Sequence, residues 1–517
     1  MKRFRQFFVC VLLTVSFNVA AVTNFEVDGI GYSSEDGKYA TIVSVKDKDY
    51  EGEVTIPVVV NYDGKTYGVK SIGDNACKGR TGITKVTISN GITSIGNSAF
   101  AGCGNLNSVN IPNSITTIGS YAFSGCYVLS NSIELPQGIE VINDHTFSGC
   151  TLLPYVKIPS SVKSIGEYSF FYCHHLTSVV IPDGTISVGA FSFCGCERLE
   201  TIDFSNSITY IGSYAFSGCS RLSSVNIPKN VTEIDMGAFS GCAMLTSINV
   251  DPDNIVYDSR DNCNAIIKKS NMSLVQGCKN TIFPTGVKSI GPDAFYGCSG
   301  LTSIEIPKTV TSIGMSAFDN CANLYSVTIP EDVNEIWYSA FRNCISLTDI
   351  IIPNGVSVVE SQVFYGCTSL SNIDIPSSVT TINEMAFSNC TGLKRIICRA
   401  DMPPTITSND VFANVGSDVE VYVPCASLVD YMIADGWNYF DSSNFKCIED
   451  LVNVNESTSE NIKDAISISE KLITVNGKDP SDIRVYNTAG LPVGNPVPAS
   501  GVYVVKVGDE AVKVMVK

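Results

Sequence analysis

The sequence predicts a β-solenoid, in which short parallel strands from successive repeats stack into one continuous core. The first observation is a column of phenylalanines that recurs in steps of 23 residues, with one step of 24 and one gap of 56. The second is a cysteine three residues after each of these phenylalanines. The third is an I-x-I alternation, typical of a strand, between each cysteine and the next phenylalanine. The phenylalanine column comprises Phe100, Phe123, Phe147, Phe170, Phe193, Phe216, Phe239, Phe295, Phe318, Phe341, Phe364 and Phe387.

A single repeat lacks the core to fold alone. It offers about seven apolar side chains, each worth roughly 1.5–3 kcal/mol when buried. Ordering its backbone costs roughly 1–2 kcal/mol for every residue. Stacked repeats share their hydrogen bonds and their core, so the array folds where one copy does not. Within a repeat, "SIEIP" predicts a short strand, "VTSIG" a second short strand, and "AFxxC" a tight turn.

These segments carry a resemblance to a known family. "LTSIEIP", "VTSIG" and "AFSGC" are similar to the BspA-like leucine-rich repeats of bacterial surface proteins, from about Val69 to Arg399. The resemblance implies a leucine-rich-repeat-like array of parallel strands at residues 71–398. It also implies an exported, non-enzymatic protein that adheres to host surfaces and matrix proteins.

The N-terminal residues predict export. A basic "MKRFR" precedes a short apolar core, and small residues near Ala21 suit cleavage, so we assign residues 1–21 to a signal peptide. Its removal changes the formal net charge from −17 to −17 − 3 = −20. No other apolar run is long enough to span a bilayer, so the mature chain is not expected to insert into a membrane. Residues 24–70 contain three Asp-Gly pairs between β-rich segments and predict a hairpin cap.

Four further segments complete the expected organisation. Residues 251–280 interrupt the repeats and predict an inserted hairpin, and residues 399–449 predict a C-terminal cap with a short helix that ends by Gly436. Residues 450–465 are polar and predict a linker. Residues 466–517, with "VYNTAG" and "GVYVVKV", resemble the C-terminal sorting domain of the type IX secretion system. That resemblance implies an address read by the secretion machinery; the alternative is an ordinary small β-sandwich.

The cysteine column predicts buried free thiols. Side chains at equivalent positions of stacked strands lie about 4.8 Å apart, whereas a disulfide needs Cβ atoms about 3.8 Å apart. Each repeat supplies one thiol and no neighbouring histidine, so a metal site is not expected. Outside the column, Cys263 and Cys278 flank the insert and are candidates for a disulfide that closes it. The column comprises Cys103, Cys126, Cys150, Cys173, Cys196, Cys219, Cys242, Cys298, Cys321, Cys344, Cys367 and Cys390.

Composition and motifs favour binding over catalysis. The net charge of −17 argues against nucleic acid or an anionic membrane as partner. The histidines are His145, His174 and His175, and no phosphate-binding loop, zinc motif or nucleophile elbow is present. We therefore expect no enzyme and no cofactor. A hydrolase would need a pair of acidic groups that nothing in the sequence marks.

One variable column is the candidate site. Two residues before the phenylalanine, five successive repeats carry aromatic side chains, which would form a strip roughly 20 Å long. Such a strip binds apolar side chains or sugars, or it is a structural ladder that stabilises the solenoid. The second half of the array carries Asp293, Ser316, Ser339, Gln362 and Met385 in this column. The strip comprises Tyr121, His145, Tyr168, Phe191 and Tyr214.

Together these observations predict an exported repeat protein at the cell surface, either associated with the outer membrane or extracellular. Its expected function is adhesion to a host extracellular protein. The alternative is a surface glycan-binding component of a nutrient-capture system. The fold alone does not name the ligand, because many binders share it.

Overall fold

The computed structural model describes residues 22–43 and 52–448 and, in the C-terminal region, 466–469, 472–475, 483–487, 492–493, 497, 501–507 and 510–516. The predicted signal peptide at 1–21 and the predicted linker at 450–465 lie outside the described residues. The chain divides into two compact units. Unit 1 consists of Met1–Leu222 with Asn230–Ala238, and unit 2 consists of Ser223–Lys229 with Phe239–Lys517.

Unit 1 begins with two hairpins. Strands β1 (Thr23–Val27) and β2 (Ile30–Ser34) pair antiparallel across Asp28-Gly29, and both turn residues have positive φ. Strands β5 (Val59–Tyr62) and β6 (Lys65–Ile72) pair in the same way across Asp63-Gly64. Both turns have the geometry that Asp-Gly pairs favour. These hairpins precede the repeats, and β6 also pairs in parallel with β3 (Tyr39–Val43) and with the first repeat.

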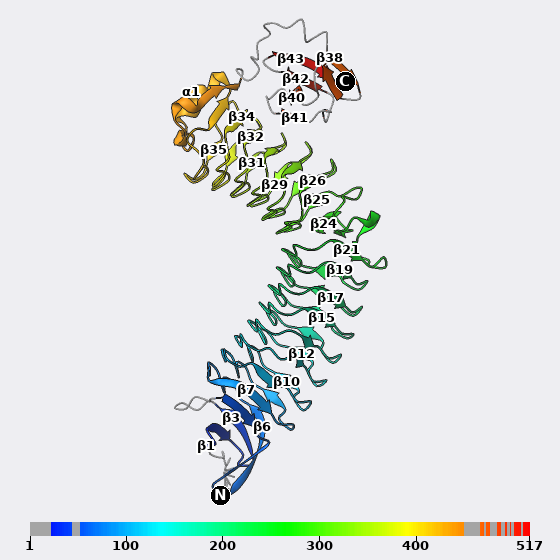
Figure 1. Cartoon of the computed structure of the whole chain (residues 1–517), viewed down its shortest axis with the longest axis vertical. Coiled ribbons are helices and arrows are strands. Elements are labelled where there is room, and N and C mark those ends of the chain that lie inside the picture. The colour runs from blue at the N-terminus through cyan, green and yellow to red at the C-terminus, as the bar shows by residue number, and fades with distance from the viewer. Residues whose placement is uncertain are drawn as a thin grey trace, which may run out of the picture. The chain divides into compact units, whose positions relative to one another are not determined.

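Each repeat of unit 1 adds one short strand to each of two stacks of parallel strands, here called ladders, whose hydrogen-bonded pairing is divided into several sheets (Figure 1). The first ladder comprises β4 (Gly52–Ile56), β7 (Ile83–Ile88), β9 (Ser108–Asn110), β11 (Ile133–Glu134), β13 (Val156–Lys157), β15 (Ser178–Ile181) and β17 (Thr201–Phe204). The second comprises β6, β8 (Ser94–Ile95), β10 (Thr117–Ile118), β12 (Val141–Ile142), β14 (Ser164–Ile165), β16 (Ser187–Val188), β18 (Tyr210–Ile211) and β20 (Glu233–Ile234). The predicted β-solenoid of 23-residue repeats is thus confirmed.

Unit 2 has the same two ladders. The first comprises β19 (Ser224–Ile227), β21 (Ser247–Val250), β26 (Ser303–Glu305), β28 (Ser326–Thr328), β30 (Asp349–Ile351), β32 (Asn372–Ile375), β34 (Arg395–Cys398), β36 (Glu420–Val423) and β37 (Phe445–Cys447). The second comprises β24 (Ser273–Gln276), β25 (Ser289–Ile290), β27 (Ser312–Ile313), β29 (Glu335–Ile336), β31 (Val358–Val359), β33 (Thr381–Ile382) and β35 (Thr405–Ile406). Parallel pairing therefore continues beyond residue 398, where the repeats were expected to end.

The core of each unit is a stack of phenylalanine rings. Phe123 and Phe147 have ring centroids 5.4 Å apart and planes 5° apart, and Phe295 and Phe318 have centroids 5.1 Å apart. The Ala, Ile and Leu residues of the consensus fill the space around the rings and are almost fully buried. Because each ring lies on the ring of the next repeat, the fixed 23-residue period translates directly into a continuous core.

The glycine after the second strand allows close stacking of the repeats. A Cβ atom on Gly314 would lie 2.7 Å from the backbone carbon of Gly291 and 2.7 Å from the nitrogen of Pro292. These distances are far shorter than a normal contact, so a larger residue at this position pushes neighbouring repeats apart unless the backbone shifts.

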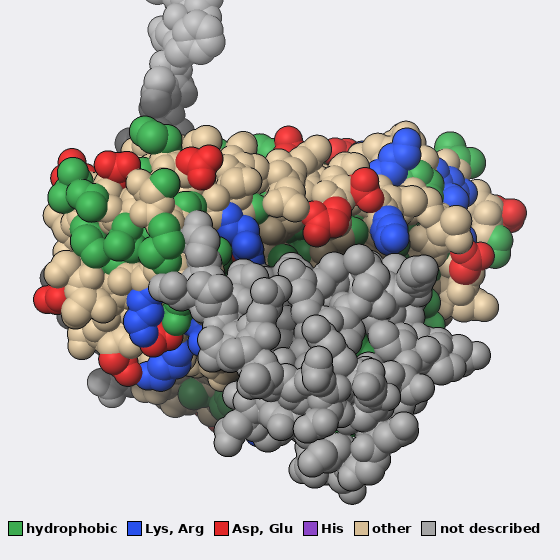
Figure 2. All heavy atoms as spheres, turned by 90° about the horizontal axis from the view of Figure 1, so that it is seen from above, with side chains coloured by type: hydrophobic (Ala, Val, Ile, Leu, Met, Phe, Trp, Pro, Cys, Tyr) green, Lys and Arg blue, Asp and Glu red, His purple; other side chains and the backbone are tan. Residues whose placement is uncertain are grey.

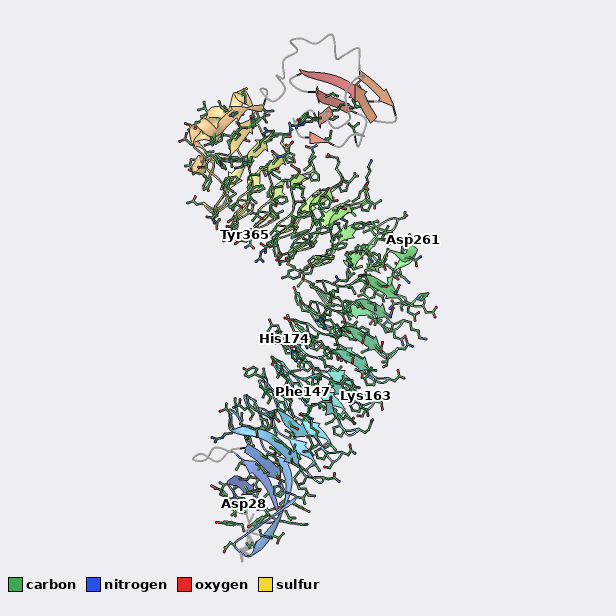
Figure 3. All side chains as sticks on the ribbon, in the orientation of Figure 1. Asp28, Phe147, Lys163, His174, Asp261 and Tyr365 are labelled. Carbon is green, nitrogen blue, oxygen red and sulfur yellow. A yellow bond between two sulfur atoms is a disulfide. The ribbon has the colours of Figure 1, made fainter. Side chains whose placement is uncertain are left out.

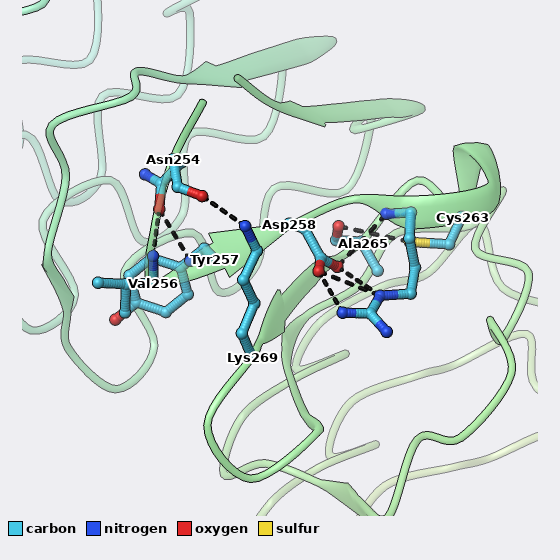
Figure 4. Close-up of polar contacts among 8 residues, drawn as sticks. Asn254, Val256, Tyr257, Asp258, Cys263, Ala265 and Lys269 are labelled. Atoms are coloured by element: carbon cyan, nitrogen blue, oxygen red, sulfur yellow. Dashed lines mark hydrogen bonds and ion pairs between the residues drawn. The ribbon is translucent and has the colours of Figure 1, made fainter. Parts of the chain in front are cut away.

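The insert at 251–280 is more closely built into unit 2 than expected. Strands β23 (Ile266–Lys268) and β24 pair antiparallel, as the sequence predicts. However, β24 also pairs in parallel with β25, so the second strand of the hairpin serves as a strand of the second ladder. Strand β22 (Tyr257–Asp258) and the 3-10 turn η1 (Arg260–Asn262) complete the insert. The side-chain oxygen of Asn254 accepts the N–H groups of Val256 and Tyr257 at 2.9 and 2.8 Å (Figure 4).

The C-terminal cap closes the core of unit 2 with aromatic residues. Phe412 stacks on Phe387 at 5.8 Å, and Trp437 and Tyr431 are fully buried beyond it. Helix α1 (Leu428–Ile433) ends three residues before Gly436, and the turns η2 (Cys425–Ser427), η3 (Trp437–Tyr439) and η4 (Ser442–Asn444) surround it. Figure 2 shows hydrophobic side chains gathered on the side where α1 lies in Figure 1. Helix α1 carries two exposed apolar side chains, Val429 and Ile433.

The described part of residues 466–517 consists of antiparallel strands. Strand β38 (Ile466–Ser469) pairs with β39 (Leu472–Val475). A four-stranded sheet has the order β41-β40-β42-β43. Its strands are β40 (Ile483–Asn487), β41 (Pro492–Val493), β42 (Gly501–Val507) and β43 (Glu510–Val516). The identity of this segment as a sorting domain stays a prediction.

Candidate binding surface

The five residues of the predicted strip form one uninterrupted stack in unit 1. Ring centroids are 4.3 Å apart for Tyr121 and His145, 4.7 Å for His145 and Tyr168, 4.7 Å for Tyr168 and Phe191, and 5.1 Å for Phe191 and Tyr214. The ring planes are nearly parallel, with angles of 8°, 3°, 7° and 21° in the same order. The structure thus brings all five predicted residues together.

The backbone holds these rings in an uncommon conformation. All five residues have φ between 53° and 60°, in the left-handed region that bulky side chains avoid. The N–H of Tyr168 donates to the carbonyl oxygen of Ala190 at 2.9 Å, and the N–H of His145 donates to that of Glu167 at 2.9 Å. Ser316 and Gln362 in unit 2 adopt the same φ, so the turn itself imposes the conformation. The turn therefore sets the backbone conformation from which the five rings of the strip project.

The stacking decides which part of each ring meets solvent. Each inner ring has a neighbour on both faces, so its exposed part is an edge. Tyr121, at one end of the strip, is 43% exposed, while the other four side chains are half-buried. Partial burial lowers the pKa of His145, although Asp144 and Glu167 oppose this shift. The imidazole is thus neutral at pH 7 and stacks without a charge.

A branch of the strip was not predicted. The ring of Phe171 meets the ring of Tyr168 edge to face, with centroids 5.3 Å apart. The next ring is Tyr172, whose centroid lies 4.0 Å from that of Phe171. His174 stacks on Tyr172 with ring centroids 5.4 Å apart. Figure 3 shows His174 and Lys163 at opposite edges of the repeat array. Tyr172 is 48% exposed and occupies, with φ of 56°, a position where the neighbouring repeats carry glycine. That replacement is the sequence signal that would have revealed the branch.

The same column in unit 2 carries no aromatic side chain from Asp293 to Met385. Asp293 and Ser339 are buried, and Ser316, Gln362 and Met385 are half-buried. The aromatic strip with its branch is therefore a feature of unit 1.

The twelve thiols of the cysteine column are free and buried, as predicted. Burial raises the pKa of Cys150 to about 12, which keeps the thiol protonated. The structure corrects the suggested disulfide between Cys263 and Cys278. Neither forms a disulfide; the thiol of Cys263 donates to the backbone oxygen of Ala265 (Figure 4), and that of Cys278 donates to the backbone oxygen of Asn264. A disulfide instead joins Cys425 and Cys447 in the C-terminal cap, a pairing that the sequence analysis missed.

Among the described residues, no group of three or more His, Cys, Asp or Glu side chains is arranged to hold a metal ion. Within the same residues, no helix has the length and apolar character needed to cross a bilayer.

Comparison with known proteins agrees with this architecture. The model of the BspA type leucine rich repeat region matches residues 70–183, 142–267 and 266–394, which together span more than half of the chain. The chain belongs to the BspA-type leucine-rich repeat family. A BspA-type solenoid is typically a binding scaffold rather than an enzyme, and its repeats suit the binding of other proteins.

Two solved structures resemble this BspA-type chain. A leucine-rich cell surface protein from Faecalibacterium prausnitzii shares 30% identity with a TM-score of 0.58, over 76% of this chain and 98% of that one. A leucine-rich repeat protein from Bacteroides ovatus shares 28% identity with a TM-score of 0.47, over 77% of this chain and 99% of that one. No functionally curated protein matches the chain.

Proposed function

We propose that this protein is a non-enzymatic adhesin of the bacterial cell surface, and that it binds a host extracellular protein through the aromatic strip of unit 1. The observation that carries the proposal is the stack from Tyr121 to Tyr214 with its branch to His174. Rigid aromatic side chains lose little conformational entropy on binding and are enriched at the centres of protein interfaces.

The orientation of the rings favours a protein over a glycan. A sugar binds an aromatic side chain by lying on the face of the ring. In the strip, the inner rings cover one another's faces at 4.3–5.1 Å, which leaves their edges for a ligand. Ring edges and tyrosine hydroxyls suit apolar and hydrogen-bonding side chains of a protein. Within the stack, a glycan would reach a ring face only at an end, such as Tyr121, which is 43% exposed.

Charge supports a partner with a basic surface. The exposed carboxylates of Asp144 and Glu167 lie beside His145, which is neutral at pH 7. The whole chain carries a formal net charge of −17. A basic partner would gain attraction over long distances and associate faster at low salt.

Export completes the proposal. The N-terminal segment would direct the chain out of the cytoplasm, and residues 466–517 would present an address to the secretion machinery. This part rests on the sequence of residues 1–21 and on the resemblance of the C-terminal strands to a sorting domain. The F. prausnitzii relative, described as a cell surface protein, supports the same location.

The test replaces two rings of the strip. Tyr168→Ser with Tyr214→Ser introduces the residue that Ser316 and Ser339 already provide at the same φ in unit 2, so the solenoid should fold. We expect a loss of about 1–3 kcal/mol in stability, because the double replacement removes three stacked ring contacts and one edge contact. Affinity for an immobilised panel of host matrix proteins should fall more than tenfold, which is about 1.4 kcal/mol.

The matched control is Tyr325→Ser, which removes an exposed tyrosine from unit 2, where its side chain is 53% exposed. This variant should bind as the native protein does. A glycan array measured beside the protein panel separates the two ligand classes. Unchanged binding with a lower melting temperature would show that the strip is structural; binding to glycans alone would support the nutrient-capture alternative.

A further inference from the structure

The second ladder of unit 2 is interrupted at one point. Strands β24, β25, β27 and β29 pair in order, and β31, β33 and β35 pair in order, but β29 and β31 belong to different sheets. Between β31 and β33, for example, two further backbone hydrogen bonds join the repeats. The N–H of Thr380 donates to Ser357 O at 2.9 Å, and the N–H of Asn383 donates to Val359 O at 2.8 Å. Among the described residues, the equivalent bonds from Ser357 and Glu360 to the β29 strand do not form.

Large side chains lie on both sides of the opening. Trp337 and Glu360 occupy, in their repeats, the position of Gly314. Asn383 occupies the same position in the next repeat, yet its N–H still donates to Val359 O at 2.8 Å, so the loss of glycine does not by itself open the ladder. Ring centroids are 5.9 Å apart for Phe341 and Phe364, against 5.3 Å for Phe318 and Phe341, so the phenylalanine core remains stacked across the opening.

The opening forms a pocket. Its volume is about 160 Å³, and Trp337 is 47% exposed beside it. One oxygen of the Glu360 side chain accepts the side-chain amide of Asn383 at 3.0 Å, so the carboxylate is held in place by the next repeat. The pocket therefore combines an indole, two carboxylates and the open backbone of the ladder. Its lining consists of Asn334, Glu335, Ile336, Trp337, Ser357, Val358 and Glu360.

We propose that this pocket binds an alkylammonium group, presented as a lysine side chain by a protein partner. An indole is the best aromatic acceptor for a cation, and the carboxylates of Glu335 and Glu360 supply negative charge with no basic residue in the lining. Carbonyl oxygens left unpaired on β29 offer acceptors for the ammonium N–H groups. This site lies in unit 2 and is independent of the aromatic strip in unit 1.

The experiment uses the full chain and a small probe, Nα-acetyl-lysine methylamide, with its Nε-acetylated form as the uncharged counterpart. Saturation-transfer NMR detects probe binding in every variant, and the fluorescence of Trp337 provides a second signal, since the chain has two tryptophans and Trp437 is buried. We expect saturable binding of the charged probe that weakens at least fivefold in 0.5 M salt. The acetylated probe should bind at least tenfold more weakly.

Two variants and a control assign the pocket. Glu360→Gln keeps a side-chain oxygen that can accept from Asn383 but removes the negative charge. The affinity for the charged probe should fall about tenfold. Trp337→Gly introduces the glycine that the preceding repeat carries as Gly314 and should abolish binding, with an unchanged circular dichroism spectrum. Glu384→Gln removes an exposed carboxylate outside the lining and should have no effect. Equal binding of both probes, binding of methyl glucoside instead, or full binding by Trp337→Gly would overturn the proposal.

Discussion

The thiol of Cys321 donates a hydrogen bond to the carbonyl oxygen of Phe295 in the preceding repeat, with Sγ and O 3.1 Å apart. Cys344 makes the same bond to Phe318 at 3.2 Å, and Cys173 to Phe147 at 3.3 Å. The cysteine therefore does more than fill a corner of the repeat, because its weak donor links each turn to the one before it. A small side chain that can also donate a hydrogen bond, such as the thiol of cysteine, therefore suits this position.

The thiol bonds predict a modest, local stability effect. Cys321→Ala removes the donor and leaves a small void, but Phe295 O still accepts the N–H of Cys298 at 2.9 Å. We expect a loss of about 1–2 kcal/mol in the free energy of unfolding, measured by denaturant titration. Cys194→Ala, outside the column and half-buried, is the control.

Alkylation adds a second measurement to that prediction. In native protein the column thiols should react slowly, because burial raises their pKa and blocks access. After denaturation without reductant, each should react with about one equivalent of reagent. Detection of a Cys321–Cys344 disulfide by mass spectrometry would contradict the thiol ladder.

A buried carboxylate predicts pH-dependent stability. The Asp319 side chain is 2% exposed, and its nearest charged partner is Arg342, with Nη1 and Oδ2 3.6 Å apart. Burial raises the pKa of Asp319 to about 6, with a further increase from Asp293 and a partial offset from Arg342. Since the folded-state pKa exceeds the unfolded value, the native state binds the proton more tightly. Stability should therefore fall as pH rises from about 4 to 6, and stay lower above that range.

Asp319→Asn tests this dependence. At pH 7 the free energy of unfolding of the variant should exceed that of the native protein by on the order of 2 kcal/mol. Between pH 4 and 6 the variant should no longer show the decrease in stability that Asp319 causes. Scanning calorimetry across that range measures both effects. The exposed Asp332→Asn is the matched control. An identical slope in native and Asp319→Asn protein would show that this carboxylate is not the titrating group.

The disulfide predicts a stabilised C-terminal cap. Cys425 and Cys447 are 22 residues apart, and closing a loop of this length contributes about 3 kcal/mol through the unfolded chain. Replacing both by serine should lower the temperature at which the fluorescence of buried Trp437 changes. Because repeats contact mainly their neighbours, hydrogen exchange around Phe123 should stay the same. Equal cap stability with and without the bond would contradict this expectation.

The C-terminal strands predict a defect in export rather than in folding. Deletion of Ile466–Lys517 should leave the melting temperature of the repeats unchanged, because their Phe and Cys columns end before it. Surface labelling of intact cells should lose the protein, while a periplasmic fraction retains it in folded form. If the truncated protein still reaches the surface in native amounts, the segment is not the export address.

The repeat period was sufficient to predict the solenoid and the buried thiols of the cysteine column. Each of these depends on one residue type recurring at one position, and the stacked geometry repeats with it. The stack from Tyr121 to Tyr214 was predictable for the same reason. The Asp28-Gly29 hairpin was predictable because its turn geometry is local.

The tertiary structure alone decided the features that depend on distances between different repeats. The pairing of Cys425 with Cys447 required the cap to fold back beside the last strands, and the sequence shows only that cysteines are present. The branch through Tyr172 arises because its ring lies over Gly195 of the next repeat. The pocket at Trp337 lies where strands β29 and β31 do not pair, which the repeat pattern does not indicate. A period specifies which residues are neighbours, but atomic packing between them determines whether the space is filled or open.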